Sequence, residues 1–462
     1  MDILLTHGYY LYEDPHELAV MKPYPPLGLL YISAHLKARG FDVHLFDTTF
    51  ARPAELEAFI EREKPPVVGI YSNLMTRQNA LRAARAARAA GSVVVMGGPD
   101  PANYLDEYLS RDTDVVVIGE GELTLEELLT RGTHDLSDIQ GVAYRDASGA
   151  IVRNEPRTMI ADLDAQPFPD RAAIDQAAYV NVWREHHGMG AVSLITARGC
   201  PYTCTWCSHA VFGYSHRRRT PANVVDEVQH IVDTYHPDLL WYADDVFTIN
   251  YKWLYEYADL LEQRGLKVPF ETISREDRLN EEVVATLARM GCSRLWIGAE
   301  SGSQKVLDAM KRRTDAERVK LMVHLLQRHG ISVGMFIMLG YDGEERSDIE
   351  ETVAHLKAAG PDTFLTTVAY PIKGTPYYAS VADRVVAHHD WETGSDRDYG
   401  VAGRHSPRYY RFATRWMVSE VALHRARRNA SLRAYPRLAR NFLSAKVGRL
   451  GMLLTERERE LA

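Results

Sequence analysis

Cysteine is scarce in this sequence, with four residues in a chain of 462. Four cysteines are too few for a disulfide framework in a chain of this length. Three of them fall within eight positions, at Cys200, Cys204 and Cys207. Crowded thiols in a cysteine-poor chain indicate metal or redox chemistry in a reducing compartment. The fourth, Cys292, precedes a predicted strand and is expected to be a small buried residue.

Long apolar runs are also missing. No run approaches the roughly 20 residues that a membrane span needs. The first ten residues, MDILLTHGYY, lack the basic segment of a secretory leader. Hydrophobic residues make up 46% of the chain and charged residues 25%, which excludes a largely disordered protein. The sequence therefore predicts a soluble, cytoplasmic protein with no membrane partner.

Positive charge is in deficit over most of the chain. The formal net charge is −8, although residues 401–462 hold 14 Lys and Arg against four Asp and Glu. Residues 1–400 therefore carry −18. Such an acidic body argues against nucleic acid as a partner and favours a cationic small molecule as substrate.

Short β-branched runs alternate with helical patterns along the first 130 residues. This alternation predicts an α/β fold with a parallel sheet covered by helices on both faces, a doubly wound, flavodoxin-like domain. The predicted strands are 3–6, 43–46, 67–71, 93–96 and 115–118.

A second alternating series follows a predicted hairpin at 141–155 and an irregular linker at 162–170. Its six strand–helix units are too few for a closed eight-stranded barrel and predict a partial one, with the active site at the carboxyl ends of the strands. These strands are 191–196, 239–243, 270–274, 294–298, 333–339 and 363–369. The chain after about residue 380 is predicted to be helical. The expected division is 1–140, 141–185, 186–380 and 381–462.

The strongest signal is the segment ARGCPYTCTWC, residues 197–207, directly after the first barrel strand. Its C-x3-C-x2-C spacing places three thiolates on one loop, where they can bind three corners of a 4Fe-4S cluster and leave the fourth iron open. A structural zinc site usually has a second pair of cysteines, which is absent here, although His209 could supply a fourth ligand.

These residues resemble the radical S-adenosylmethionine (SAM) superfamily. In that superfamily SAM chelates the open iron, and an electron from the cluster cleaves SAM to a 5′-deoxyadenosyl radical. The N-terminal part resembles the cobalamin-binding domain of one class of these enzymes, and the partial barrel resembles the radical SAM barrel. The matching segments are PYPPLGLLYISAHLKARG, GIYSNLMT, GGPDP, GEGE, FGYSHRRRTPANVVDEV, WYADDVFTIN, ESGSQKVLDAM, MLGYDGE and VAYPIKGTP.

The resemblance implies a role for each matching residue. Cys200, Cys204 and Cys207 would bind the cluster, and Trp206 would pack near the adenine of SAM. Other residues at strand ends would bind SAM: Asp244, Ser274, Arg275, Glu300, Ser301, Gly340 and Tyr370. The candidate catalytic residues are Asp245 and Glu300, as carboxylates, and Tyr214, as a hydrogen donor.

The resemblance also implies an external low-potential electron donor, such as a flavodoxin, a ferredoxin or a dedicated reductase. The run Arg217–Arg219 follows the cysteine loop. It is either a solvated charge run or a docking patch for such an acidic donor.

Cobalamin binding is left open by the sequence. The Asp-x-His-x-x-Gly loop that gives some cobalamin domains a histidine ligand is absent. Tyr9, Tyr10 and Tyr12 follow the first strand, and Met75 follows the third. These bulky side chains could fill the volume of a corrin, so bound cobalamin and a substrate-capping cleft remain alternatives.

Several reactions also remain alternatives. The acidic body favours dehydration of a cationic amino-sugar diol, as in aminoglycoside deoxygenation during antibiotic biosynthesis. Cobalamin-dependent C-methylation is the second reaction, and ring rearrangement or oxidation is the third. A non-catalytic iron–sulfur electron carrier is an alternative of a different class.

Overall fold

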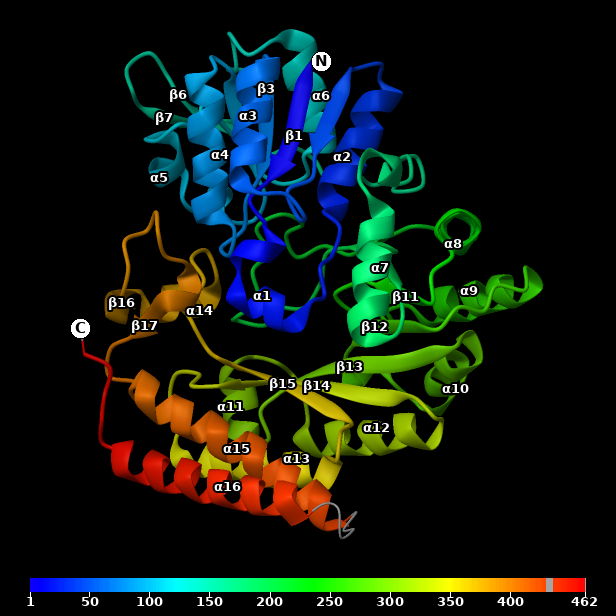
Figure 1. Cartoon of the computed structure of the whole chain (residues 1–462), viewed down its shortest axis with the longest axis vertical. Coiled ribbons are helices and arrows are strands. Elements are labelled where there is room, and N and C mark those ends of the chain that lie inside the picture. The colour runs from blue at the N-terminus through cyan, green and yellow to red at the C-terminus, as the bar shows by residue number, and fades with distance from the viewer. Residues whose placement is uncertain (429–434, 462) are drawn as a thin grey trace. The chain divides into compact units, whose positions relative to one another are not determined.

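The computed structural model describes residues 1–428 and 435–461, which form two compact units (Figure 1). The first unit contains residues 1–201, 208–244 and 389–395. The second contains residues 202–207, 245–388 and 396–462. Both units are α/β, as predicted.

A seven-stranded sheet dominates the first unit, in the order β2-β1-β3-β4-β5-β6-β7 (Figure 1). The first five strands of this order are parallel, in the arrangement typical of flavodoxin-like domains. The strands are β1 (Ile3–His7), β2 (Val43–Phe46), β3 (Val67–Tyr71), β4 (Val93–Gly97), β5 (Val115–Val117), β6 (Val142–Arg145) and β7 (Ile151–Arg153). The first five therefore lie where the β-branched runs predict them.

Alternate residues of these strands face two separate cores. Leu4, Val68 and Val94 pack in the core that contains residues of α3 (Pro53–Glu63), α4 (Arg77–Ala89) and α5 (Leu105–Leu109). Ile3 and Leu5 pack in the core that contains residues of α2 (Leu27–Ala38) and α6 (Glu122–Arg131). Burial on both faces explains why these strands are almost continuously apolar.

The predicted hairpin at 141–155 is present but is part of this sheet. β6 pairs antiparallel with β5 and with β7. The Gly149 N–H donates to the Asp146 carbonyl oxygen across the turn, at 2.9 Å.

Residues 389–395 complete the core of the first unit from far along the chain. The Trp391 ring lies edge-on to Tyr108, with centroids 5.0 Å apart, and 4.7 Å from the Arg77 guanidinium. Arg77 is buried, pairs with Asp100 at 2.7 Å and donates to the Trp391 carbonyl oxygen at 3.2 Å. The region after about residue 380 is helical as predicted in α15 (Pro407–Arg428) and α16 (Tyr435–Thr455), but residues 389–395 pack without helical structure.

The first unit also contains the first two strands of the predicted barrel, β8 (Ala191–Leu194) and β11 (Leu239–Tyr242), which are parallel. Its remaining elements are α1 (Pro15–Val20), α7 (Gln176–His187), α8 (Pro221–Tyr235) and the pair β9 (Ala197–Arg198) and β10 (Arg217–Arg218).

The second unit contains the other four predicted barrel strands as a parallel sheet. They are β12 (Phe270–Ser274), β13 (Cys292–Glu300), β14 (Ser332–Leu339) and β15 (Thr363–Val368). The helices that alternate with them or follow them are α9 (Tyr251–Gln263), α10 (Glu281–Met290), α11 (Gln304–Ala309), α12 (Ala316–Arg328), α13 (Arg346–Ala359) and α14 (Pro376–Val381). An antiparallel pair that the sequence did not predict follows, β16 (Val385–Ala387) and β17 (Tyr399–Val401).

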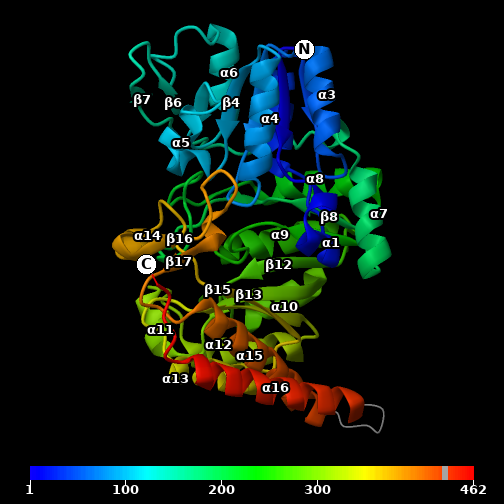
Figure 2. The ribbon, with the colours of Figure 1, turned by 60° about the vertical axis from the view of Figure 1, so that its left-hand side comes forward.

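Two long helices end the second unit, α15 (Pro407–Arg428) and α16 (Tyr435–Thr455). α15 contacts both α13 and α16, and α16 lies on the outer side of α15 (Figure 2). Within residues 1–428 and 435–461, none of the helices is long and apolar enough to cross a membrane. Short 3-10 helices occur as η1 (Leu11–Glu13), η2 (Pro101–Asn103), η3 (Arg171–Ala173), η4 (Glu276–Arg278), η5 (Ala382–Arg384) and η6 (Asp396–Asp398).

Candidate active site

The cysteine loop begins at a sharp turn after β9. Gly199 has φ +83°, and a Cβ at this position would lie 2.5 Å from the Ser215 carbonyl oxygen. Only glycine accepts both the left-handed backbone and this close approach. The glycine of the motif therefore turns the chain from β9 into Cys200.

Arg275, which is buried, and Arg312, whose side chain is 12% exposed, lie beside Cys204 in the second unit. Arg312 Nη1 is 3.5 Å from the Cys204 Sγ, and Arg275 Nη1 is 3.9 Å from it. A hydrogen bond with Cys207, together with these positive charges, lowers the pKa of Cys204 to about 5. Cys204 and Cys207 thus lie next to each other, and the surroundings favour thiolate, the form that binds iron, at Cys204, whereas the hydrogen bond with Cys204 and burial raise the pKa of Cys207.

A threonine between the two cysteines anchors the loop. The Thr205 N–H and hydroxyl both reach the Met310 carbonyl oxygen, at 3.1 and 3.0 Å, and the hydroxyl is 2.7 Å from the Tyr341 hydroxyl. Among the described residues, no three His, Cys, Asp or Glu side chains are gathered as a closed metal site. The adjacent thiols of Cys204 and Cys207, with two arginines beside them, are compatible with cluster binding, and the assignment of Cys200, Cys204 and Cys207 as the three ligands stays a prediction.

Arg275 is held rigidly where the sequence places it, directly after β12. Its guanidinium donates to Asp277 Oδ1 at 2.9 Å and to the Arg312 carbonyl oxygen at 2.9 Å. It also lies 4.0 Å from the centre of the Tyr202 ring. The neighbouring Ser274 is buried and shares a hydrogen bond with Thr248.

Glu300 combines an unusual backbone with a charged neighbour. Its φ is +60°, a left-handed region that non-glycine residues adopt rarely, and Glu300 adopts it at the end of β13 rather than at a helix C-terminus. Its Oε1 lies 3.9 Å from Arg312 Nε, and burial raises the pKa of the carboxyl group. Ser301, which follows, is buried and bonds to the Thr352 hydroxyl at 3.1 Å.

Two residues of this region were not predicted from the sequence, Arg312 and Glu276. Arg312 lies in the run Lys311-Arg312-Arg313, which looks like an ordinary surface charge run. Glu276 is buried, burial raises its pKa, and its carboxylate oxygens lack a hydrogen-bond partner within the part of the chain that the structure describes. No motif in the sequence marks either residue.

The residues predicted to surround adenine also come together in the second unit. The Trp206 and Tyr370 rings lie edge to face with centroids 5.7 Å apart, and the indole N–H donates to the Tyr370 carbonyl oxygen at 3.2 Å. Gly340 has φ +75° and leaves no room for a Cβ, which would lie 2.9 Å from the Tyr410 ring. Their roles toward SAM stay predictions.

Asp244 has a different environment from its neighbour Asp245. Its buried carboxylate accepts hydrogen bonds from the Thr196 and Ala197 N–H groups, at 2.7 and 3.2 Å, and pairs with Arg218 at 2.7 Å. These contacts join β11 to the start of the cysteine loop. Asp245 is exposed.

Tyr214 lies in the first unit with 52% of its surface exposed, and its ring packs on His209 with centroids 4.1 Å apart. Its role as a hydrogen donor stays a prediction.

The prediction that Arg217–Arg219 form a docking patch or a solvated run is wrong. Arg217 pairs with Glu120 at 2.7 Å, and Arg218 with Asp244. Arg219 forms a buried pair with Glu227. All three guanidinium groups form ion pairs within the chain, so their charges are neutralised internally and do not form a docking surface.

A buried charge network links the loop after β5 to the strand before the cysteines. Arg198 Nη1 and Nη2 each donate at 2.7 Å, to Glu120 and Glu122 respectively. All three side chains are at most 8% exposed. The glutamates of the GEGE segment thus hold the residue that stands two positions before Cys200.

The bulky side chains after β1 and β3 differ in their burial. Tyr10 is buried in the chain's own interior, whereas Tyr12 and Met75 are about half exposed. Leu18 and Val20 of α1 are also exposed. The loops with Tyr12 and Met75 follow β1 and β3, at the edge where doubly wound domains bind ligands.

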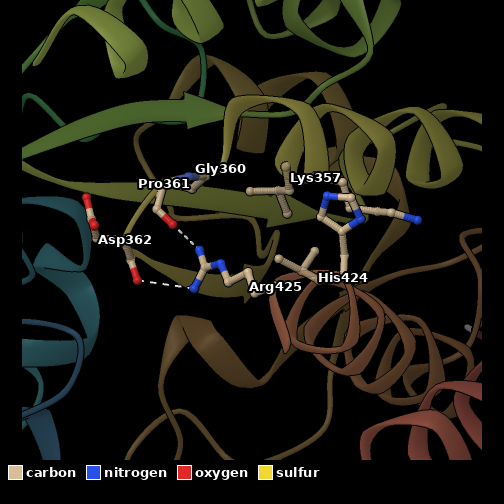
Figure 3. A pocket seen from close by; sticks show the side chains of 8 residues that line it. Lys357, Gly360, Pro361, Asp362, His424 and Arg425 are labelled. Carbon is tan, nitrogen blue, oxygen red and sulfur yellow. Dashed lines mark hydrogen bonds between the residues drawn. The ribbon is translucent and has the colours of Figure 1, made fainter. Parts of the chain in front are cut away.

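A separate cavity of about 330 Å³ lies between the end of α13 and α15 (Figure 3). Arg425 there donates to the Asp362 carbonyl oxygen at 3.1 Å. Because Pro361 and Asp362 precede β15, this cavity lies at the amino end of that strand, away from the edge that carries the cysteines.

Comparisons with known proteins agree with this geometry. Residues 194–356 match the family model of the radical SAM superfamily, and residues 19–129 match that of the B12 binding domain. The chain is 28% identical over 383 residues to the uncharacterized methyltransferase PH0819 of Pyrococcus horikoshii, covering 79% of this chain and 81% of that one. It is 28% identical over 377 residues to the anaerobic magnesium-protoporphyrin IX monomethyl ester cyclase of Rubrivivax gelatinosus (78% and 67% covered).

Another relative is the cytidylyl-2-hydroxyethylphosphonate methyltransferase of Streptomyces wedmorensis, 27% identical with 76% of each chain covered. Among solved structures, the cobalamin-dependent SAM radical enzyme OxsB matches with a TM-score of 0.77 at 16% identity, covering 98% of this chain and 72% of that chain. The radical SAM methyltransferase TsrM of Kitasatospora setae matches with a TM-score of 0.67 at 19% identity (82% and 74% covered). These likenesses confirm the fold.

We expect Cys204→Ala to abolish both iron binding and release of 5′-deoxyadenosine, because two thiolates hold a cluster poorly. Cys292→Ala is the matched control, since Cys292 is buried outside the motif and should leave both unchanged. Iron quantitation and a visible spectrum, recorded without oxygen, measure the first effect. A normal 5′-deoxyadenosine yield from Cys204→Ala would contradict the cluster assignment.

We expect Arg312→Gln to make the reduction potential of the cluster more negative, because it removes a positive charge close to a cysteine ligand. The shift should be roughly 60 mV, equivalent to a tenfold change in a one-electron equilibrium. A potentiometric titration followed by electron paramagnetic resonance measures it. The exposed neighbour Arg313, as Arg313→Gln, should leave the potential unchanged, and equal shifts in both variants would refute the effect.

We expect Glu122→Gln to destabilise the first unit by about 3 kcal/mol, because it leaves part of the buried Arg198 charge unpaired. The control Glu127→Gln, on the same helix with partly exposed partners Arg131 and Arg157, should cost about 1 kcal/mol or less. Thermal unfolding midpoints of the full chain compare the two. Equal midpoints would show that the buried network contributes little.

Proposed function

We propose that this chain, a radical SAM enzyme with an N-terminal B12-binding domain, is a cobalamin-dependent methyltransferase of a small polar molecule. The observation that carries the proposal is the B12-binding domain, at residues 19–129, on the same chain as the cysteine motif. The relatives PH0819 and the phosphonate enzyme, both methyltransferases by name, align with about three quarters of the chain, across both parts.

When bound, the cluster supplies the electron that cleaves SAM, and cobalamin supplies a cobalt that carries a methyl group. The chain's own residues would bind the cluster and line the SAM site. Cys200, Cys204 and Cys207 would bind iron, and Arg312 and Arg275 would balance the charge of the thiolates. The Trp206 and Tyr370 rings, which pack edge to face, would contact the adenine of SAM.

A cationic group on SAM or on the substrate has carboxylates available in the second unit. Glu300 lies beside Arg312, and the buried Glu276 has uncommitted oxygens within the described residues. Desolvated ammonium groups bind best to such carboxylates. The charge of −18 on residues 1–400 further favours a cationic substrate.

The exposed side chains at the carboxyl edge of the N-terminal sheet support cobalamin over a capped cleft. Tyr12 and Met75 are about half exposed there and so leave apolar surface available. A corrin would cover such surface, which otherwise costs free energy in water.

Radical dehydration of an amino-sugar diol is the second candidate. The observation that favours it is the net charge of −18 on residues 1–400, which suits a cationic substrate. Methyl transfer is preferred because dehydration gives the B12-binding domain no role.

The deciding experiment measures both products of SAM in the full chain, reconstituted with iron and sulfide under a low-potential reductant. Methyl transfer predicts S-adenosylhomocysteine when hydroxocobalamin is added, because SAM must also serve as the methyl source. It also predicts one cobalamin retained per chain after gel filtration. Release of 5′-deoxyadenosine alone, independent of cobalamin, would support dehydration and reject methyl transfer.

A further inference from the structure

Helix α16 has one face that is fixed against α15. A Cβ at Gly448 would lie 2.6 Å from the Trp416 backbone nitrogen, and one at Gly451 would lie 2.4 Å from the Phe412 ring. Ala445 and Met452 are buried on the same side. This close packing fixes which residues of α16 face outward.

The outward face carries a stripe of aliphatic side chains. Its members are Leu443, Val447, Leu450 and Leu454, which are exposed by 63%, 45%, 59% and 75%. Their spacing of four, three and four residues places them on one side of the helix. Phe442 and Leu453 beside them are exposed as well. Contiguous exposed apolar side chains of this kind mark an interaction surface.

Positive charge flanks this stripe and negative charge is absent from the helix. Residues 435–455 include Arg437, Arg440 and Lys446, all exposed, and no Asp or Glu. A fourth cation, Arg449, lies 3.8 Å from Glu350 of α13 and over the Trp416 ring of α15. The partner must therefore tolerate or attract at least three cations next to the aliphatic stripe.

We propose that α16 lies on an anionic phospholipid surface, with the aliphatic stripe in the acyl boundary and the Arg437, Arg440 and Lys446 side chains at the headgroups. Aliphatic side chains bordered by Lys and Arg are typical of helices that lie in a membrane interface, because the long cationic side chains reach the headgroups while their stems stay apolar. Such a helix binds without crossing the bilayer.

The same features disfavour two other binding partners for this face of α16, a second copy of the chain and a different protein. A second copy of the chain would bring the Arg437, Arg440 and Lys446 side chains of two α16 helices together, and neither helix carries an Asp or Glu to pair with them. A protein partner is usually anchored by Trp, Tyr and Arg, whereas Leu and Val are under-represented among residues that dominate protein interfaces. This surface role is independent of the reaction that the enzyme catalyses.

The test is sedimentation of the full, cluster-loaded chain with vesicles of phosphatidylcholine alone or with added phosphatidylglycerol. We expect binding to the anionic vesicles only. Leu450→Gln with Leu454→Gln should weaken it at least about tenfold, since two side chains lose their burial in the acyl boundary. Arg440→Gln with Lys446→Gln should weaken it by about tenfold or more, since each charge near an anionic surface contributes to binding.

The control is Leu321→Gln on α12, where the side chain is 59% exposed and lies outside the stripe. It should leave vesicle binding unchanged, and circular dichroism checks that every variant is folded. Failure to bind anionic vesicles, or binding that the Leu450/Leu454 variant does not weaken, overturns the proposal. Two other results would also overturn the proposal if vesicles do not bind. One is a dimer, seen by light scattering, that the Leu450/Leu454 variant disrupts. The other is a complex with an acidic flavodoxin that the same variant disrupts.

Discussion

Buried guanidinium groups, each matched by a carboxylate, a carbonyl or a thiol, secure the cysteine loop along its length. Removing a charge from water costs several kcal/mol unless a partner replaces the lost solvation. Arg198 meets this requirement through Glu120 and Glu122, and Arg218 meets it through Asp244. In the second unit, Arg312 and Arg275 lie against Cys204. The conformation of the loop therefore depends on ion pairs that come from residues far apart in the sequence.

The sequence predicts the scaffold well because its signal is local. Runs such as Val93–Val95 and Val115–Val117 can only be buried strands, and all six barrel strands end within two residues of their predicted limits. The cysteine motif and the glycine before it are local in the same sense.

What the sequence did not predict depends on partners distant in the chain. Arg217–Arg219 look like a surface run, and only the folded chain brings Glu120, Asp244 and Glu227 to them. Arg312 is equally inconspicuous until β13 and α11 place it beside Cys204. The sequence also does not say which way the tyrosines after β1 point, and in the structure Tyr10 is buried whereas Tyr12 is about half exposed. No periodic pattern marks the segment around Trp391, which lies between two very short strands.

That segment has a consequence for how the protein is made. Residues 389–395 belong to the first unit, although the chain between residues 245 and 388 belongs to the second. On the ribosome, domains usually fold in order as they emerge. Here the buried Arg77 guanidinium and the Tyr108 ring lack the Trp391 ring until nearly 400 residues have been synthesised. The first unit therefore completes its core late in translation, and a nascent chain that stops before residue 389 holds an N-terminal domain with an uncovered aromatic and cationic surface.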